Sequence, residues 1–266
     1  MKISSMVNPR NYPELRATLF GIHYPALVEL KLDGELDWCV GQGGQSEPYF
    51  INKRGKVRTE MPILEAIKKR MASKPFELVG ELFHGQGENH ALYALNSNRE
   101  SDDLNFYPFD IIGYENQSLV DCPLVDRKEI IASHLWDLIP ARPIIVYSEK
   151  DVEKEFEKAC KAGFEGIVIK NLDGRYITGA CPWVKLKFSD QSDYVVTMID
   201  PVKERIEIAV SSVTSNGAPL TRTVGAKCSH TQKRALRVGS LVTIEHHGLM
   251  EGGSLRNPVF IGVAKP

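Results

Sequence analysis

The pattern of hydrophobic and polar positions predicts many short strands and a few helices. Apolar residues recur at helical spacing in residues 63–71, 127–138 and 152–162, and a short helix is also predicted near residues 14–20. Runs of β-branched and aromatic residues predict strands at 26–32, 35–40, 49–52, 76–82, 105–112, 166–170 and 183–188. Asp33-Gly34 is a turn signal, and it favours residues 35–40 as the return strand after the strand at 26–32.

The pattern changes after residue 189. Five β-rich runs follow, at 194–199, 206–213, 221–225, 241–246 and 259–263. Five short strands in so short a segment are typical of a small barrel of the OB-fold type. We therefore expect two domains, 1–189 and 190–266. The fold class is α+β, with antiparallel sheets and helices in the first domain and a small β-barrel in the second.

Composition restricts the class of protein. The chain has 266 residues, 42% of them hydrophobic and 25% charged, which excludes disordered, collagen-like and fibrous proteins. The net charge of −1 is not typical of a nucleic-acid binder, but a local basic face is enough for binding. No apolar run reaches the roughly 18 residues that span a bilayer, and no secretory signal is recognised, so we expect a cytoplasmic protein. The scattered cysteines form no C-x-x-C pair, which argues against a zinc ribbon or a disulfide framework.

The first candidate for chemistry is Lys31, which ends a hydrophobic strand two residues before Asp33. A lysine becomes a strong nucleophile when it is neutral, and burial or nearby positive charge favours that form. On its own the pattern also fits a surface lysine beside a tight turn. Glu81 and Glu165 are each tied to a hydrophobic strand, and two carboxylates near one lysine suit a divalent metal beside a phosphate.

Lys185 and Lys187 alternate along one predicted strand, so both point to the same face. Two ammonium groups on one face are suited to holding the phosphates of a nucleotide. A solvated strand face is the alternative for this pair.

Six segments, in order, resemble the nucleotidyltransferase motifs of ATP-dependent DNA ligases. They are KLDG (31–34), NKRGK (52–56), VGEL (79–82), FYPFD (106–110), EGIVIK (165–170) and WVKLK (183–187). The resemblance covers residues 27–188, and SLRNPVF (254–260) is similar to the stretch before the last ligase motif. It implies a minimal two-domain ligase, in which an ATP-grasp-like nucleotidyltransferase domain precedes an OB-fold domain. The sequence departs from the family pattern at Leu36, where an arginine is usual, and lacks the final R-x-D-K motif.

The resemblance implies a catalytic set. Lys31 would attack the α-phosphate of ATP and form lysyl-AMP, while Asp33 would position the 3′-OH of a nick. Lys185 and Lys187 would bind the α-phosphate and orient the leaving group. Besides ATP, the family needs Mg²⁺ (or Mn²⁺), and Glu81 and Glu165 are the residues implied to hold this metal or the ribose.

The resemblance also implies a set of nucleotide contacts. Glu29 would contact the edge of adenine, Phe109 would stack on it, and Arg54 would bind a phosphate of AMP or of the nick. Lys170 and Trp183 are supporting members of their motifs.

The activity implied is ATP-dependent sealing of 3′-OH/5′-phosphate nicks in duplex DNA, through lysyl-AMP and AMP-DNA intermediates, as in DNA replication, repair and recombination. The partner is nicked double-stranded DNA, no membrane is involved, and a monomer is expected. Residues 85–101 are a candidate loop for clasping the duplex. Candidate phosphate ligands in the barrel are Lys203, Arg205, Arg222, Lys227, Lys233, Arg234, Arg237 and Arg256.

Two other readings stay open. One is a related enzyme acting on RNA, either an RNA ligase or a capping guanylyltransferase, because contacts to 2′-OH groups cannot be read from sequence. The other is a catalytically silent protein that binds nicks.

Overall fold

The computed structural model describes residues 6–7, 19, 21–84, 104–139, 142–162, 164–177, 181–213, 219–248 and 253–264. The chain divides into two compact units, Met1–Lys187 and Phe188–Pro266. The candidate clasping loop at 85–101, and all but residue 19 of the helix predicted near 14–20, lie outside the described residues. Within the described residues, no helix has both the length and the apolar character needed to cross a membrane.

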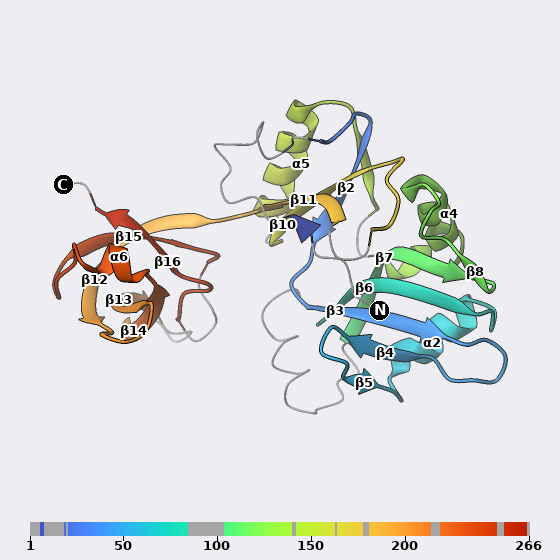
Figure 1. Ribbon diagram of the computed structural model, residues 1–266, viewed down its shortest axis with the longest axis horizontal. Coiled ribbons are helices and arrows are strands. Elements are labelled where there is room, and N and C mark those ends of the chain that lie inside the picture. Colours follow the sequence, from blue (N-terminus) through green and yellow to red (C-terminus); the bar gives the residue numbers. More distant parts are fainter. Residues whose placement is uncertain are drawn as a thin grey trace. The chain divides into compact units, whose positions relative to one another are not determined.

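The first unit contains two sheets and the larger helices (Figure 1). The five-stranded sheet has the order β1 (Met6–Val7), β11 (Cys181–Lys187), β10 (Gly166–Asn171), β2 (Ala26–Lys31) and β9 (Ile144–Val146). The six-stranded sheet has the order β5 (Val57–Arg58), β4 (Tyr49–Asn52), β3 (Glu35–Gly41), β6 (Phe76–His84), β7 (Leu104–Tyr114) and β8 (Gln117–Ser118). The helices are α2 (Pro62–Arg70), α4 (Leu124–Leu135), the 3-10 turn η2 (Trp136–Leu138) and α5 (Glu149–Lys161).

Each sheet buries one face under helices. On the five-stranded sheet, Val28, Ile167 and Val184 pack against Val152 and Phe156 of α5. The α5 helix begins at a Ser148 cap, whose side chain accepts a hydrogen bond from the backbone of Asp151, and it has a strong apolar stripe.

The six-stranded sheet forms a second hydrophobic core with α2 and α4. Phe50, Leu78 and Ile111 from the strands meet Ile67 of α2 and Ile131 of α4. The opposite faces of the two sheets share a third cluster, which contains Leu32, Val79, Tyr107, Phe109, Ile112, Val168, Tyr176 and Trp183. Because side chains alternate along a strand, every second residue of β2, β10 and β11 faces this space between the sheets.

The predicted hairpin at Asp33-Gly34 is wrong. The strand β2 pairs with β9 and β10, whereas β3 pairs with β4 and β6, so the two strands belong to different sheets. The physical reason is a close approach, because a Cβ atom on Gly34 would lie 2.2 Å from the carbonyl oxygen of Leu82 in β6. The glycine therefore lets the link pass directly onto the second sheet and holds the Lys31 turn against it.

The second unit is a closed five-stranded barrel. Its strand order is β12 (Asp190–Ile199), β13 (Arg205–Val213), β14 (Pro219–Lys227), β16 (Val259–Val263) and β15 (Leu241–His246). The short helix α6 (His230–Lys233) lies between β14 and β15 in the chain, and β14 pairs with β16 in parallel. Alternate residues such as Ile206, Ile208 and Ile244 fill the interior. These features define an OB-fold, and the predicted α+β class with a terminal barrel is confirmed.

Candidate active site

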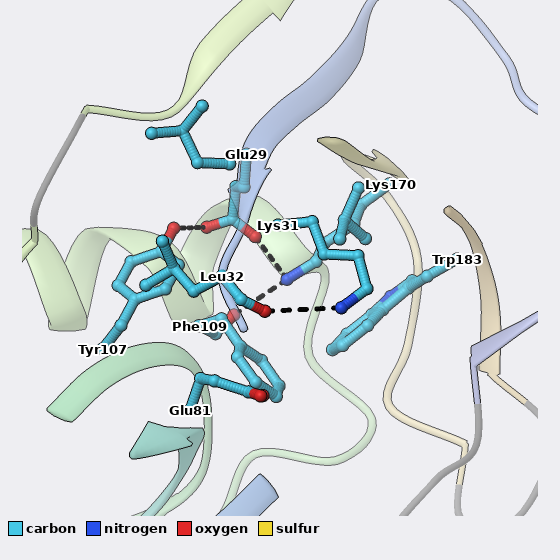
Figure 2. Close-up of a pocket in the computed structure, with 10 residues that line it drawn as sticks. Glu29, Lys31, Leu32, Glu81, Tyr107, Phe109, Lys170 and Trp183 are labelled. Carbon is cyan, nitrogen blue, oxygen red and sulfur yellow. Dashed lines mark hydrogen bonds and ion pairs between the residues drawn. The ribbon is translucent and has the colours of Figure 1, made fainter. Parts of the chain in front are cut away.

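A pocket lies between the two sheets of the first unit (Figure 2). Its lining is Glu29, Leu30, Lys31, Leu32, Glu81, Tyr107, Phe109, Val168, Lys170 and Trp183. The cavity measures about 30 Å³, because side chains fill the space between the sheets. The Lys170 ammonium lies 3.8 Å from the centroid of the Trp183 ring, so a nucleobase enters only if these side chains move.

Strand register brings the charged residues of the five-stranded sheet together. On β2, Lys31 lies opposite Gly166 of β10, which in turn lies opposite Lys187 of β11. Two residues further along β10, Val168 lies opposite Glu29 of β2 on one side and opposite Lys185 of β11 on the other. The structure therefore places Lys185 and Lys187 on one face, as the period-two pattern predicts, and the register adds Lys31 of β2 to that face.

Glu165 joins two of these lysines beside the end of the pocket that Lys31 and Glu81 line. We call this group the reacting end (Lys31, Glu81, Glu165, Lys185 and Lys187). Its Oε2 accepts a hydrogen bond from Lys31 Nζ, and its Oε1 lies 2.6 Å from Lys187 Nζ. Glycine follows it for a steric reason, because a Cβ atom on Gly166 would lie 1.9 Å from the Leu186 carbonyl oxygen, at a φ of +148°. Burial raises the pKa of Glu165, but the ammonium groups of Lys31 and Lys187 lower it overall.

Glu81 approaches the same lysines from the second sheet. Its Oε1 accepts the backbone N–H of Gly34 at 3.0 Å. The pKa of Glu81 is raised to about 7. Burial raises it most, the Glu165 and Asp33 carboxylates add to this, and Lys31 and the Gly34 N–H oppose it. Burial, followed by the charges of the neighbouring lysines, lowers the pKa of Lys185 to about 8.

The donor set fits a divalent cation that also binds phosphate. No group of three or more His, Cys, Asp or Glu side chains in the described part of the chain is arranged to hold a metal ion. Mg²⁺, however, is usually bound by one or two carboxylates together with water and substrate phosphates. Glu81 and Glu165 supply two carboxylates that interact electrostatically, because Glu165 adds to the rise in the pKa of Glu81 that burial mainly causes.

The other end of the pocket, which we call the base end, is built around Glu29 (Figure 2). Tyr107 donates its hydroxyl to Glu29 Oε1 at 2.7 Å, and Lys128 donates to the same oxygen. Lys170 forms an ion pair with Oε2 and also donates to the Phe109 carbonyl at 3.0 Å. Burial raises the pKa of Glu29, but the Lys128 and Lys170 ammonium groups lower it overall to about 2.

Two aromatic rings border this end. The Phe109 and Trp183 rings meet edge to face, with centroids 5.7 Å apart at 87°. Tyr176 packs on Trp183 in a similar way, with centroids 6.4 Å apart. The structure therefore brings Glu29, Phe109 and Trp183 to one place, as expected for members of one binding site.

Arg54 lies outside the pocket lining, on the exposed turn between β4 and β5. Asn52 Oδ1 accepts the backbone N–H groups of Arg54 and Lys56 at 2.9 and 3.0 Å, and its Nδ2 donates to Glu35 Oε1 at 2.7 Å. Because Glu35 follows Gly34 directly, this basic turn is anchored at the strand end nearest the Lys31 link.

The barrel cations differ in their availability. Lys203, Arg205 and Lys227 are exposed, and Arg205 and Lys227 face each other across β13 and β14. Arg256 is half-buried. The prediction that Lys233 contacts DNA is wrong, because this buried ammonium donates to the carbonyls of Asp200 and Lys203 at 2.5 and 2.6 Å.

Sequence reasoning missed the role of α4. Arg127 is fully buried and pairs with Asp110, its Nε 2.7 Å from Oδ1, and its neighbour Lys128 reaches Glu29. The signal was a basic residue at an apolar position, since Arg127, Ile131 and Leu135 share one helical face.

Comparisons with known proteins agree with this architecture. The family described as the ATP dependent DNA ligase domain has a model that matches residues 9–187. DNA ligase 1 of Methanosarcina barkeri is 25% identical over 188 residues, which cover 62% of this chain and 34% of that protein. The DNA ligase of Saccharolobus shibatae is 28% identical over 197 residues, which cover 66% of this chain and 32% of that protein. The chain thus spans about a third of the length of these curated relatives.

Solved structures share the fold along the whole chain. A structure from a structure–function analysis of Lig E DNA ligases gives a TM-score of 0.68 at 18% identity, with 99% of both chains covered. The ATP-dependent DNA ligase of bacteriophage T7, in complex with ATP, gives a TM-score of 0.53 at 16% identity, covering 99% of this chain and 98% of that one. The family match covers well over half of the sequence, so the resemblance is confirmed and the chain belongs to the ATP-dependent DNA ligase family.

Proposed function

We propose that this chain is an ATP-dependent DNA ligase that seals 3′-OH/5′-phosphate nicks in duplex DNA. One observation carries the proposal: Lys31, at the pocket wall, shares the Glu165 carboxylate with Lys187, and Glu81 lies beside them. A nucleophilic amine, further ammonium groups and two carboxylates are the components that phosphoryl transfer to a lysine requires.

The first step forms lysyl-AMP. Lys31 Nζ attacks the α-phosphorus of ATP as the neutral amine, a P–N bond forms, the bond to the bridging oxygen breaks, and pyrophosphate leaves. Lys185 and Lys187 neutralise charge on the phosphate oxygens, and Glu29 and Phe109 position the base. Glu81 and Glu165 would hold Mg²⁺ (or Mn²⁺), which supplies further neutralisation of phosphate charge when bound.

The later steps consume the adduct on DNA. An oxygen of the nick 5′-phosphate attacks the AMP phosphorus, the P–N bond breaks, and Lys31 is released. Asp33 then helps to position the 3′-OH, which attacks the 5′-phosphorus and displaces AMP. Arg54 and the barrel cations Lys203, Arg205, Lys227 and Arg256 bind backbone phosphates, so affinity falls steeply with salt. A monomer that acts in the cytoplasm stays a prediction.

Intact mass tests the proposal directly. The purified protein, freed of bound AMP, is mixed with Mg²⁺ and ATP, GTP or NAD, and compared with Lys31→Ala and with the control Lys68→Ala. We expect a gain of one AMP with ATP alone, absent only in Lys31→Ala, followed by sealing of a nicked duplex. A GMP adduct would move the chain to the capping enzymes, and no adduct with any donor would favour a silent nick-binding protein.

A further inference from the structure

Lys128 reaches the pocket from outside the six motif segments. It lies on α4 (Leu124–Leu135), and its ammonium donates to Glu29 Oε1, the oxygen that also accepts the Tyr107 hydroxyl at 2.7 Å. The Lys128 side chain is only 13% exposed and the Glu29 side chain only 1%. Lys128 Nζ also lies 5.9 Å from the centroid of the Tyr107 ring. One oxygen of a pocket carboxylate is thus held by two donors from two elements.

The start of α4 is fixed firmly enough to aim this side chain. Arg127 and Asp110 form a fully buried pair with two contacts, Nε to Oδ1 at 2.7 Å and Nη2 to Oδ2 at 3.1 Å. Arg127 also donates to the carbonyl of Gly174 at 3.1 Å. Because Asp110 follows Phe109 in β7, the same pair ties the helix to the strand that carries the aromatic wall.

Among the residues that the structure describes, three groups contact the Glu29 carboxylate: Lys128 from α4, Lys170 from β10 and Tyr107 from β7. Burial favours the protonated acid, and the two ammonium groups reverse that preference. An ionised carboxylate only accepts hydrogen bonds, so it suits a base edge with an amino donor and opposes one with a carbonyl oxygen. Removing Lys128 takes away one of the two ammonium groups that oppose the effect of burial on the pKa of Glu29.

We infer that Lys128 is a positioning residue for base selection, which fixes Glu29 in its ionised form and thereby favours a nucleotide with an exocyclic amino group over one with a carbonyl. The inference rests on the proposed function, because it concerns the same nucleotide site. Lys128 does not touch the reacting atoms, so its loss changes recognition rather than the transfer step.

The test is self-nucleotidylylation of the full chain with ATP and with GTP. Lys128→Gln should raise the KM for ATP, here the ATP concentration that gives half the maximal rate, on the order of 10–100-fold, the range for losing a hydrogen bond to a charged group. The single-turnover rate at saturating ATP, which takes the place of kcat, should stay within about twofold. The preference for ATP over GTP should fall by a similar factor. Lys128→Arg should restore most of it. Lys68→Gln is the matched control, because Lys68 is a shielded helical lysine, 19% exposed, paired with Glu47 away from the pocket lining.

The pH profile gives a second readout. In the wild-type chain, Glu29 stays ionised at mildly acidic pH, so the KM for ATP should not change there. In Lys128→Gln, the KM for ATP should rise as the pH falls. The effect of Lys128→Gln on base preference should also vanish in a Glu29→Gln background, because the lysine acts through Glu29. Lys128→Met, which keeps the apolar stem, replaces Lys128→Gln if that variant does not fold.

The outcomes separate this inference from the proposed function. A folded Lys128 variant with wild-type base preference and pH profile would overturn the inference, as would a loss of kcat with unchanged KM. An absence of any adduct in the wild-type chain would instead overturn the proposed function. The inference stands if the wild-type chain forms its adduct and only the Lys128 and Glu29 variants change base preference.

Discussion

Two carboxylates line the same pocket, and their surroundings move their pKa values in opposite directions. At the base end, burial raises the pKa of Glu29, but Lys128 and Lys170 lower it overall to about 2. At the reacting end, burial raises the pKa of Glu81 to about 7, and the charge of Lys31 does not reverse this. Burial raises the pKa of both carboxylates, so the difference lies in the charges around them. Glu29 meets two ammonium groups, whereas Glu81 meets Lys31 together with the carboxylates of Glu165 and Asp33.

This contrast assigns different tasks to the two ends. A carboxylate that already lies beside enough cations is ionised before a ligand binds. It can accept a hydrogen bond from the ligand without any change in its own protonation state. A carboxylate with too few cations becomes more stable when another cation binds beside it. Opposed pKa shifts of neighbouring groups are a physical mark of divided roles in an active site. Recognition is therefore expected at Glu29 and chemistry beside Glu81.

The largest effect is expected from Glu165→Gln, because one carboxylate holds two ammonium groups of the reacting end. The rate of lysyl-AMP formation at saturating ATP should fall roughly 10²–10³-fold, the usual loss for one preorganised electrostatic contact. Glu29→Gln should instead weaken ATP binding and leave that rate nearly unchanged. Single-turnover adenylylation over a range of ATP concentrations measures both quantities.

Glu155→Gln is the control, since it removes the partner of the exposed Lys158 on α5. It should not change either quantity. If Glu29→Gln lowers the saturating rate as much as Glu165→Gln does, the pocket does not have two functionally distinct ends.

The next effect is a stability change whose pH dependence has opposite sign at the two carboxylates. Glu29 has a folded pKa of about 2, below its ordinary 4.5, so its stabilisation is complete above about pH 4.5 and is lost as the pH falls toward 2. Glu81 has a folded pKa of about 7, so its ionisation destabilises the fold as the pH rises from 4.5 to 7. Glu29→Gln should therefore destabilise the protein at neutral pH by about 3 kcal/mol, because it leaves two buried cations without a partner.

Glu81→Gln should stabilise the metal-free protein by about 1 kcal/mol near pH 8 and have little effect near pH 5. Urea unfolding of both variants at the two pH values measures these differences. Glu47→Gln, in the pair with Lys68, is the control for loss of an exposed carboxylate. A Glu81→Gln variant that is less stable than the wild type near pH 8 would contradict the claim that ionisation of Glu81 destabilises the fold.

The sequence allowed the residues of the reacting end to be predicted because their placement follows from local rules. Lys185 and Lys187 share a face through strand alternation, and the motif series identified Lys31, Glu81 and Glu165. The α+β class and the family are confirmed, while the roles of these residues stay predictions. Lys128 was not foreseen, because its contact with Glu29 depends on how α4 packs across the first unit.

The link at Asp33-Gly34 shows a second limit of sequence reasoning. The dipeptide has the local signal of a hairpin turn, yet the chain crosses from one sheet to the other there. What decides is the close approach of Gly34 to Leu82, a contact between residues far apart in the sequence. Similarly, the edge strand Ile144–Val146 is too short to give a periodic signal.

The smallest effect, and the sharpest test of the contrast, is expected from Leu36→Arg. Leu36 lies opposite Glu81 in the β3–β6 register and packs in the cluster between the sheets, so an arginine there places a cation beside this carboxylate. The pKa of Glu81 should fall by about one unit from about 7, as expected for a partly screened opposite charge. Carboxyl ¹³C titration of the metal-free protein measures it, with Glu81→Gln assigning the resonance.

Val57→Arg, which adds the same charge at an exposed position on β5, should leave the Glu81 titration unchanged. A lower pKa in Leu36→Arg alone means that one more cation beside Glu81 opposes the effect of burial there, as Lys128 and Lys170 do for Glu29 at the base end. It also means that a single side chain at position 36 sets how strongly Glu81 favours a bound cation. An unchanged pKa in a folded Leu36→Arg variant would show that burial alone keeps Glu81 protonated, and the comparison with Glu29 would then rest on depth.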